Sequence, residues 1–284
     1  MHAKTVRRTP AGAARKEARL TDAKVGKSAA TMDSKKEYRL TDVKTAGRTL
    51  EIFEAFAERR EPLSLSEIGR ALNAPLSSSL YLVRALEGRG YLYTLTERRQ
   101  IYPTRKLFDI GREIMVREPG MEQIEPVLIT LRDKTEETVI LGKRQGNRVV
   151  YLMVLEGTQT VRYTARTGEL KPLHSSSVGK ALLSALNPAD RLKIVSKLSL
   201  DPVTRNTITD RKALLKDLER AAARGYSETR GENVVDVMAI AKPVWLGKEL
   251  YAVAIAGPLQ RMPVDGDKHI ERLNHACMEI AEFA

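Results

Sequence analysis

The 284-residue sequence predicts an α+β fold with two domains, one small and mostly α-helical, the other combining helices with a hairpin-rich sheet. Three observations support this class. Three short helical patterns end near residue 90, an alternating hairpin pattern follows, and apolar strands alternate with capped helices beyond residue 120. We therefore divide the chain into a basic tail (1–40), an N-terminal domain (41–104), a linker helix (105–120) and a C-terminal domain (121–284).

The basic tail carries much of the positive charge of the chain. It holds 11 Lys or Arg and 4 Asp or Glu, and so contributes +7 of the net +12. It has almost no large apolar residues, so we expect it to be disordered. Two interpretations stay open: a non-specific phosphate-binding arm, and a solubilising tail or misassigned start. The near-repeat of RLTDAK as RLTDVK favours the second.

The N-terminal domain is predicted to contain three helices and a hairpin. Apolar residues at helical spacing indicate helices over residues 43–62, 63–72 and 76–87. The second helix has Ser64 or Ser66 as its N-cap, and the third ends at Gly88 or Gly90. The alternating segment YLYTLTERRQIYPT then predicts a β-hairpin of the wing type. The order helix, helix, turn, helix, wing is typical of a winged helix-turn-helix.

The third helix has the position of a recognition helix, yet its first turn carries serines and no basic residue. On a helical wheel one side of this helix is formed by Leu76, Ser79, Leu80, Val83 and Leu86, and we expect this side to face the core. The opposite side presents Ser77, Ser78, Tyr81 and Arg84. Hydroxyls and N-terminal N–H groups bind phosphates, and Arg or Tyr reaches base edges, so we expect this side to contact DNA. Further positive charge on the DNA-binding face is expected from Arg48, Arg98 and Arg99.

The C-terminal domain is predicted to alternate strands and helices after a linker helix that Pro119 and Gly120 end. Strands are expected in TVILGKRQGNRVVYLMVLEG, VRYTARTGE and MAIAKPVWLGKELYAVAIAGPL. Helices are expected in MEQIEPVLITLRDKTEE, HSSSVGKALLSAL, NPADRLKIVSKL, TDRKALLKDLERAAARG and residues 265–284. Helices flanking a hairpin-rich sheet make an α+β domain of the sensor type.

Several other functions lack the residues that they require. SSSVGKA has His174 where a phosphate loop has its first glycine, and no G-x-S-x-G elbow accompanies these serines. His269, His275 and Cys277 point in different directions around one helix, so they cannot converge on a metal. No apolar run of 18 residues is present, and a single cysteine suits a reducing compartment. We expect no enzyme activity, cofactor, metal or membrane contact, and a cytoplasmic location.

Four stretches of the sequence resemble the IclR family of transcriptional regulators, and the resemblance covers about residues 42–284. They are LSLSEIGRALNAPLSSSLYLVRALEGRGYL, GELKPLHSSSVGKALLSAL, RGYSETRGENVVDVMAIAKPVW and YAVAIAGPLQRM. The resemblance implies a winged helix-turn-helix joined to a GAF-like α/β effector-binding domain. It also implies a homodimer or tetramer on double-stranded operator DNA near catabolic genes, with a small organic or aromatic acid as effector.

The sequence departs from the family pattern in both domains. Leu76 and Tyr81 stand where many members have Lys and Arg, so base preference does not carry over. Alanines stand where the glyoxylate-responsive branch has Cys and Ser, which indicates a more apolar pocket and a larger or aromatic ligand. The residues that we expect to bind the effector are Ser176, Ser177, Val178, Asp236, Met238, Ala239, Ala254 and Ala256.

The sequence thus predicts a DNA-binding regulator of a catabolic operon, whose C-terminal domain binds a small carboxylated metabolite. The alternative is a ligand-independent or non-specific DNA-binding or architectural protein. A helix-turn-helix that serves only protein interaction is a further alternative.

Overall fold

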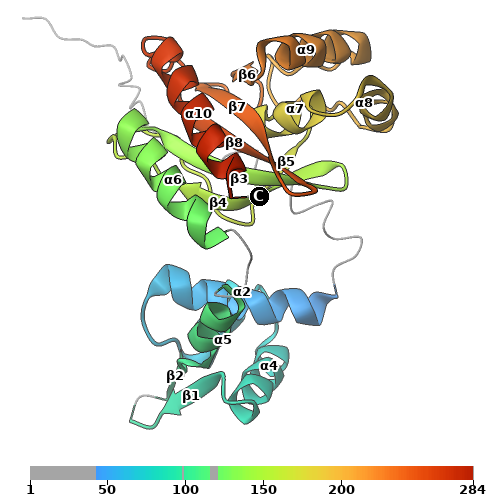
Figure 1. Ribbon diagram of the computed structural model, residues 1–284. Coiled ribbons are helices and arrows are strands. Elements are labelled where there is room, and N and C mark those ends of the chain that lie inside the picture. Colours follow the sequence, from blue (N-terminus) through green and yellow to red (C-terminus); the bar gives the residue numbers. More distant parts are fainter. Residues whose placement is uncertain (1–42, 98, 116–120, 284) are drawn as a thin grey trace, which may run out of the picture. The chain divides into compact units, whose positions relative to one another are not determined.

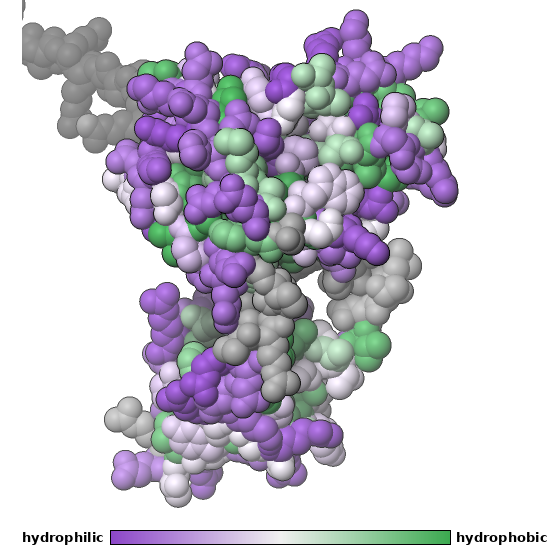
Figure 2. All heavy atoms as spheres, viewed as in Figure 1, coloured by the Kyte–Doolittle hydropathy of each residue, from purple (hydrophilic) through white to green (hydrophobic). Residues whose placement is uncertain are grey.

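The computed structural model describes residues 43–97, 99–115 and 121–283 (Figure 1). The predicted basic tail, Arg98 and the predicted helix end at Pro119 and Gly120 lie outside the described residues. Hydrophilic side chains predominate on the face drawn in Figure 2, with apolar ones scattered among them, as on most folded proteins.

The N-terminal domain has the element order of a winged helix-turn-helix. Its elements are α2 (Lys44–Arg59), α3 (Leu65–Ala71), α4 (Leu76–Gly88), β1 (Leu92–Leu95), β2 (Gln100–Pro103) and α5 (Lys106–Met115). Ser64, rather than Ser66, caps α3: its hydroxyl accepts from Glu67 N at 3.3 Å, and the Glu67 carboxylate accepts from Ser64 N at 2.8 Å. Strands β1 and β2 pair antiparallel as the predicted wing.

The core of this domain is small and mostly apolar, although the polar Ser79 is also buried. It is formed by Ile52, Ala55, Phe56, Leu63, Ile68, Leu72, Val83, Leu86, Leu92 and Ile101. Helices α2, α3 and α4 and both wing strands contribute to it, so the wing is held against the helices by the same core. Helix α5 is attached through Lys106, whose Nζ donates to the carbonyl oxygen of Arg89 at 2.8 Å.

The C-terminal domain is built on one antiparallel sheet in the order β5-β4-β3-β8-β7-β6. Its strands are β3 (Thr138–Gln145), β4 (Arg148–Leu155), β5 (Leu170–Pro172), β6 (Ser227–Arg230), β7 (Val237–Leu246) and β8 (Glu249–Pro258). Its helices are α6 (Met121–Thr135), α7 (Ser177–Ser184), α8 (Pro188–Val195), α9 (Arg211–Arg224) and α10 (Gly266–Ala281). The side of the sheet covered by α6 and α10 is the α10 face; the side covered by α7, α8 and α9 is the α7 face (Figure 1).

One expectation for the strands of this domain was wrong, and one strand was not predicted. The segment VRYTARTGE is not a strand; the strand beside β4 is β5, which begins at Leu170. The carbonyl oxygen of Tyr163 accepts a hydrogen bond from the hydroxyl of Thr138 rather than from a neighbouring strand. A turn follows, in which the backbone N–H of Glu169 donates to the carbonyl oxygen of Arg166 at 3.1 Å. Strand β6 was not predicted, because its sequence SETR has no apolar residue to mark it.

Candidate functional sites

Helix α4 presents an exposed side formed by Ser77, Tyr81 and Arg84. Tyr81 is 72% exposed, and none of the three side chains makes a hydrogen bond or ion pair with the described residues. The predicted recognition side is therefore free to meet a partner. Its role in binding DNA stays a prediction for these residues.

The other two serines of the first turn are engaged within the helix. The Ser78 hydroxyl donates to the carbonyl oxygen of Pro75 at 2.8 Å, and the buried Ser79 hydroxyl approaches the same oxygen at 3.2 Å. Pro75 occupies the N-cap position and has no capping side chain, so α4 starts without a side-chain cap. Ser79 thus lies inside as expected, whereas Ser78 can offer DNA only the lone pairs of its hydroxyl oxygen.

Leu76 was expected in the core and is instead 52% exposed. The buried residues of α4 begin at Ser79, one turn later, because the first turn of the helix extends beyond the domain core. A helical wheel assigns a direction but not the length over which a helix is covered. The first turn of α4 therefore carries an exposed apolar side chain beside Ser77.

The basic residues expected to supply charge differ in their exposure. Arg48 on α2 is half-buried, and Arg99 lies exposed in the wing turn with a left-handed φ of 47°. Neither makes an ion pair with another described residue, while Arg98 lies outside those residues. The two described arginines are thus free of carboxylate neighbours that would neutralise them.

In the C-terminal domain the N-terminus of α7 is fixed against the sheet. Ser176 is its N-cap: the hydroxyl accepts from Gly179 N at 3.1 Å and donates to the carbonyl oxygen of Pro172 at 2.8 Å. The Ser227 hydroxyl of β6 donates to the carbonyl oxygen of Ser177 at 2.6 Å. Val178 packs on β3 so closely that a Cβ at Gly142 would lie 2.8 Å from its Cγ1.

The structure brings three of the predicted alanines to this helix. Ala239 of β7 pairs with Ala256 of β8, Ala254 lies two residues earlier on β8, and all three are buried in one cluster with Val178. Small side chains let a helix approach a sheet closely, which accounts for the tight contact. Ser176, Ser177, Val178, Ala239, Ala254 and Ala256 therefore share the α7 face.

Polar groups that are not among the predicted effector-binding residues lie at the ends of this alanine row. Thr229 of β6 pairs with Ala239, Thr138 of β3 pairs with Ala256, and both threonines are buried. Ser175, next to the N-cap, is fully buried and its hydroxyl has no hydrogen-bond partner among the described residues. Thr138 could have been assigned to this face from the sequence, because it lies two residues before Ile140 on the same strand and so points to the same side of the sheet.

Met238 does not belong to this group, contrary to expectation. It packs with α6 and α10 on the opposite face, because successive residues of a strand point to opposite sides of the sheet. Asp236 is exposed just before β7, and its carbonyl oxygen accepts from Leu259 N at 2.8 Å. Its side chain makes no hydrogen bond with the described part of the chain.

Lys180 is fully buried on α7 between two carboxylates. Its Nζ donates to Glu232 at 2.6 Å and 2.8 Å and to Asp217 of α9 at 2.8 Å. Desolvation by burial raises the pKa of Glu232 above its ordinary value, and the charge of Lys180 opposes this rise. The lysine that resembles that of a phosphate loop in the sequence is thus occupied by protein carboxylates.

The remaining chemically active residues are dispersed. Burial lowers the pKa of His174, whose Nε2 lies 3.0 Å from the carbonyl oxygen of Asp201. Burial raises the pKa of the Cys277 thiol to about 12, which keeps it protonated at neutral pH. Among the described residues no cluster of metal-ligating side chains occurs, and no helix has the length and apolar character of a membrane span.

Two family descriptions match this chain. Residues 45–96 match the IclR helix-turn-helix domain, and residues 116–282 match the bacterial transcriptional regulator IclR C-terminal domain. The HTH-type transcriptional repressor AllR of Escherichia coli K12 is 31% identical over 204 residues, which are 71% of this chain and 75% of AllR.

Solved structures resemble both domains together. The IclR protein of Thermotoga maritima is similar with a TM-score of 0.71 and 26% identity, over 85% of this chain and 98% of that protein. An IclR homologue of Microbacterium hydrocarbonoxydans, crystallised with 4-hydroxybenzoate, is similar with a TM-score of 0.65 and 25% identity, over 84% of this chain and 98% of the homologue.

Proposed function

The chain belongs to the IclR family of bacterial transcriptional regulators, and we propose that it binds operator DNA sequence-specifically under the control of a small carboxylated metabolite. Members of this family are regulators with a helix-turn-helix and a C-terminal effector domain, not enzymes. The observation that carries the proposal is the exposed side of α4, where Ser77, Tyr81 and Arg84 have no partner among the described residues. A DNA-binding regulator acts where the chromosome lies, so we place it in the cytoplasm.

The α7 face supports an acid as the effector. The first turn of α7 has backbone N–H groups at Ser177 and Val178 with no intrahelical acceptor, and this positive helix end favours a carboxylate. The neighbouring alanines make the surroundings of this helix end apolar, and the buried Ser175 hydroxyl beside the N-cap has no hydrogen-bond partner among the described residues. The homologue crystallised with 4-hydroxybenzoate binds an aromatic acid of this kind. We infer that the effector is an aromatic or similarly sized acid. We also infer that the protein controls a catabolic operon.

The exposed apolar side chains of the N-terminal domain support a homo-oligomer, a dimer or tetramer. Phe108 and Ile114 on α5 are 60% and 64% exposed, and Leu50 on α2 is 64% exposed. Exposed apolar residues that form a contiguous patch mark protein interfaces, and we infer that these three lie in one. A two-fold dimer would read a palindromic site with half-sites about one helical turn apart or a multiple of it.

Effector binding would act on DNA affinity through the arrangement of the paired N-terminal domains. An acid bound at α7 stabilises one arrangement, and α5 transmits the change to the winged helices. A coupling free energy of about 1–3 kcal/mol would change operator affinity roughly 5- to 150-fold.

DNA binding is tested by fluorescence anisotropy with DNA from upstream of the protein's own gene and with an unrelated duplex. We expect the Ser77→Ala/Arg84→Ala variant to lose the preference for its own DNA while keeping salt-sensitive binding. The control is Arg220→Ala, which removes an arginine that is also exposed, from α9. With about six phosphates neutralised, affinity falls about a thousandfold between about 50 and 200 mM salt.

Equal binding of both duplexes by the wild type would contradict sequence-specific regulation and favour the alternative, a non-specific or architectural DNA-binding protein. Loss of preference in the Arg220→Ala control would show that the effect is not specific to α4.

The effector is tested separately by thermal unfolding with a panel of aromatic and aliphatic acids that includes 4-hydroxybenzoate. We expect at least one acid to raise the melting temperature of the wild type and not that of Ala254→Leu, whose larger side chain would occupy the α7 face. Ala222→Leu on the exposed side of α9 is the control. If no acid stabilises the wild type, the effector part of the proposal is wrong, whatever the DNA result.

A further inference from the structure

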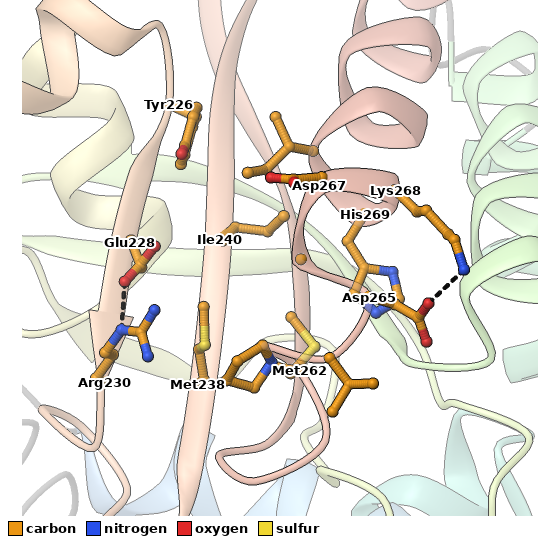
Figure 3. Close-up of a pocket in the computed structure, with 14 residues that line it drawn as sticks. Tyr226, Glu228, Arg230, Met238, Ile240, Met262, Asp265, Asp267, Lys268 and His269 are labelled. Atoms are coloured by element: carbon orange, nitrogen blue, oxygen red, sulfur yellow. Dashed lines mark hydrogen bonds and ion pairs between the residues drawn. The ribbon is translucent and has the colours of Figure 1, made fainter.

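A cavity of about 380 Å³ lies on the α10 face of the sheet, between β6 and the start of α10 (Figure 3). This volume lies in the range of small-molecule sites. Met238 and Ile240 of β7 form the floor, with Met262 beside them. The cavity exists because α10 covers β7 and β8 but leaves the edge strand β6 uncovered on this side.

The sheet separates this cavity from the proposed effector site on the α7 face. Along β7, Met238 and Ile240 face the cavity, while Ala239 and Ala241 face α7. Along β6, Glu228 and Arg230 line the cavity, whereas the intervening Thr229 pairs with Ala239. A molecule in the cavity would therefore contact β7 from the side opposite to the proposed effector site, without touching any residue of the α7 face.

The floor is apolar and adaptable. Met238, Ile240 and Met262 are each at least 97% buried, so they form a dry surface beneath the opening. Methionine side chains are flexible and polarizable and accommodate apolar groups of different shapes, aromatic rings included. Two of the three floor residues are methionines, which suits an aromatic or branched apolar group.

The charged residues of the walls leave one carboxylate unpaired. Glu228 pairs with Arg230 at 2.5 Å, and Asp265 pairs with Lys268 at 2.7 Å. Asp267, in the first turn of α10, makes no ion pair or hydrogen bond in the described part of the chain. Three carboxylates thus face two cations, which gives the lining a formal charge of −1 and favours a positively charged ligand.

His269 adds an unfilled hydrogen-bonding position to the lining. It is 4% exposed, and its Nδ1 has no partner among the described residues. Burial lowers the pKa of His269, so the ring is neutral at pH 7 and does not repel a cation. In the tautomer that carries its proton on Nε2, Nδ1 accepts a hydrogen bond, which suits a ligand with N–H donors.

We propose that this cavity is a second ligand site, which binds a small organic amine through Asp267 while Met238, Met262 and Ile240 receive its apolar body. Phenethylamine represents this class, with an ammonium group on an aromatic body. 3-Phenylpropionate has the same ring on a chain that ends in a carboxylate, and the lining would repel it.

The test uses the full-length protein with ¹³C-labelled methionine methyl groups. The chain has eight methionines, and Met238→Leu and Met262→Leu variants assign the two signals of the floor. We expect phenethylamine to shift these two signals in a saturable way, with the exposed Met278 of α10 unchanged. Asp267→Asn should raise the dissociation constant roughly fivefold. The matched control is Glu219→Gln, which removes a carboxylate from exposed α9.

Three results would overturn the proposal. They are no saturable shift of either floor signal with phenethylamine, equal or stronger shifts with 3-phenylpropionate, and equal affinity of Asp267→Asn and Glu219→Gln. Asp267 is exposed, so its substitution leaves the fold intact and the comparison interpretable. Since the readout is confined to the α10 face, its result is independent of acid binding on the α7 face.

Discussion

The two faces of the C-terminal sheet use the same strands for different purposes. On the α7 face the strands present alanines and Gly142, so α7 lies close to the backbone and Lys180 is enclosed between two carboxylates. On the α10 face they present large side chains such as Met238 and Ile255, which fill the core and leave a cavity beside the first turn of α10. Side-chain size thus decides which face is closed by a helix and which stays open at the sheet edge.

The largest expected effect on stability comes from removing the buried cation of the α7 face. Lys180→Met removes the only cation that contacts Asp217 and Glu232 in the described residues and leaves two carboxylates in a poorly solvated place. We expect a loss of about 3–5 kcal/mol in the free energy of unfolding, measured by urea denaturation. Lys212→Met, on the exposed side of α9, should change it by less than about 0.5 kcal/mol. Equal effects of the two variants would contradict the importance of the buried cluster.

A smaller effect tests the close approach of α7. Gly142→Ala places a Cβ 2.8 Å from Val178 Cγ1, so the helix or strand must shift. We expect a destabilisation of about 1–3 kcal/mol. The control is Gly111→Ala on α5, where a Cβ meets nothing within 4 Å and where alanine should stabilise the helix by about 0.5–1 kcal/mol. A neutral Gly142→Ala variant would show that α7 is loosely packed.

The smallest effect concerns the one buried histidine that each face contains. Burial lowers the pKa of His174 beside α7 and of His269 on α10 from 6.5, so the unfolded chain binds more protons than the folded one. The contribution of these two neutral histidines to the free energy of unfolding is therefore full above pH 6.5 and is lost as the pH falls below it. Urea denaturation at several pH values should show a flatter acid slope for His174→Gln/His269→Gln. His275→Gln, which replaces an exposed histidine of α10, is the control.

Elements with local signals could be predicted from the sequence. Capping residues marked the start of α3, for which Ser64 or Ser66 was predicted and Ser64 is observed. Alternation marked the hairpin β1–β2, and apolar segments around short polar turns marked β3–β4 and β7–β8. These features depend on hydrogen bonds or patterns within a few residues, which a sequence displays directly.

Features set by distant contacts could not be predicted in this way. The segment around Tyr163 looks like a strand, but a side-chain hydrogen bond from Thr138 takes its carbonyl. The partners of Lys180 lie 37 and 52 residues away, and nothing local connects them. Met238 was assigned to the effector group by family position, although the alternation of β7 excludes it from the α7 face.

Because side chains alternate along β7, the residues on its two sides can be varied independently of each other. If an acid binds the α7 face as we propose, positions 239 and 241 could be randomised to change which acid is bound, with positions 238 and 240 left intact. A library at positions 238 and 240 would alter only the cavity on the α10 face. A single-residue insertion ahead of the strand would exchange both sets at once, because it turns every side chain to the other side of the sheet. Selections on this scaffold should therefore vary side chains and hold segment lengths constant.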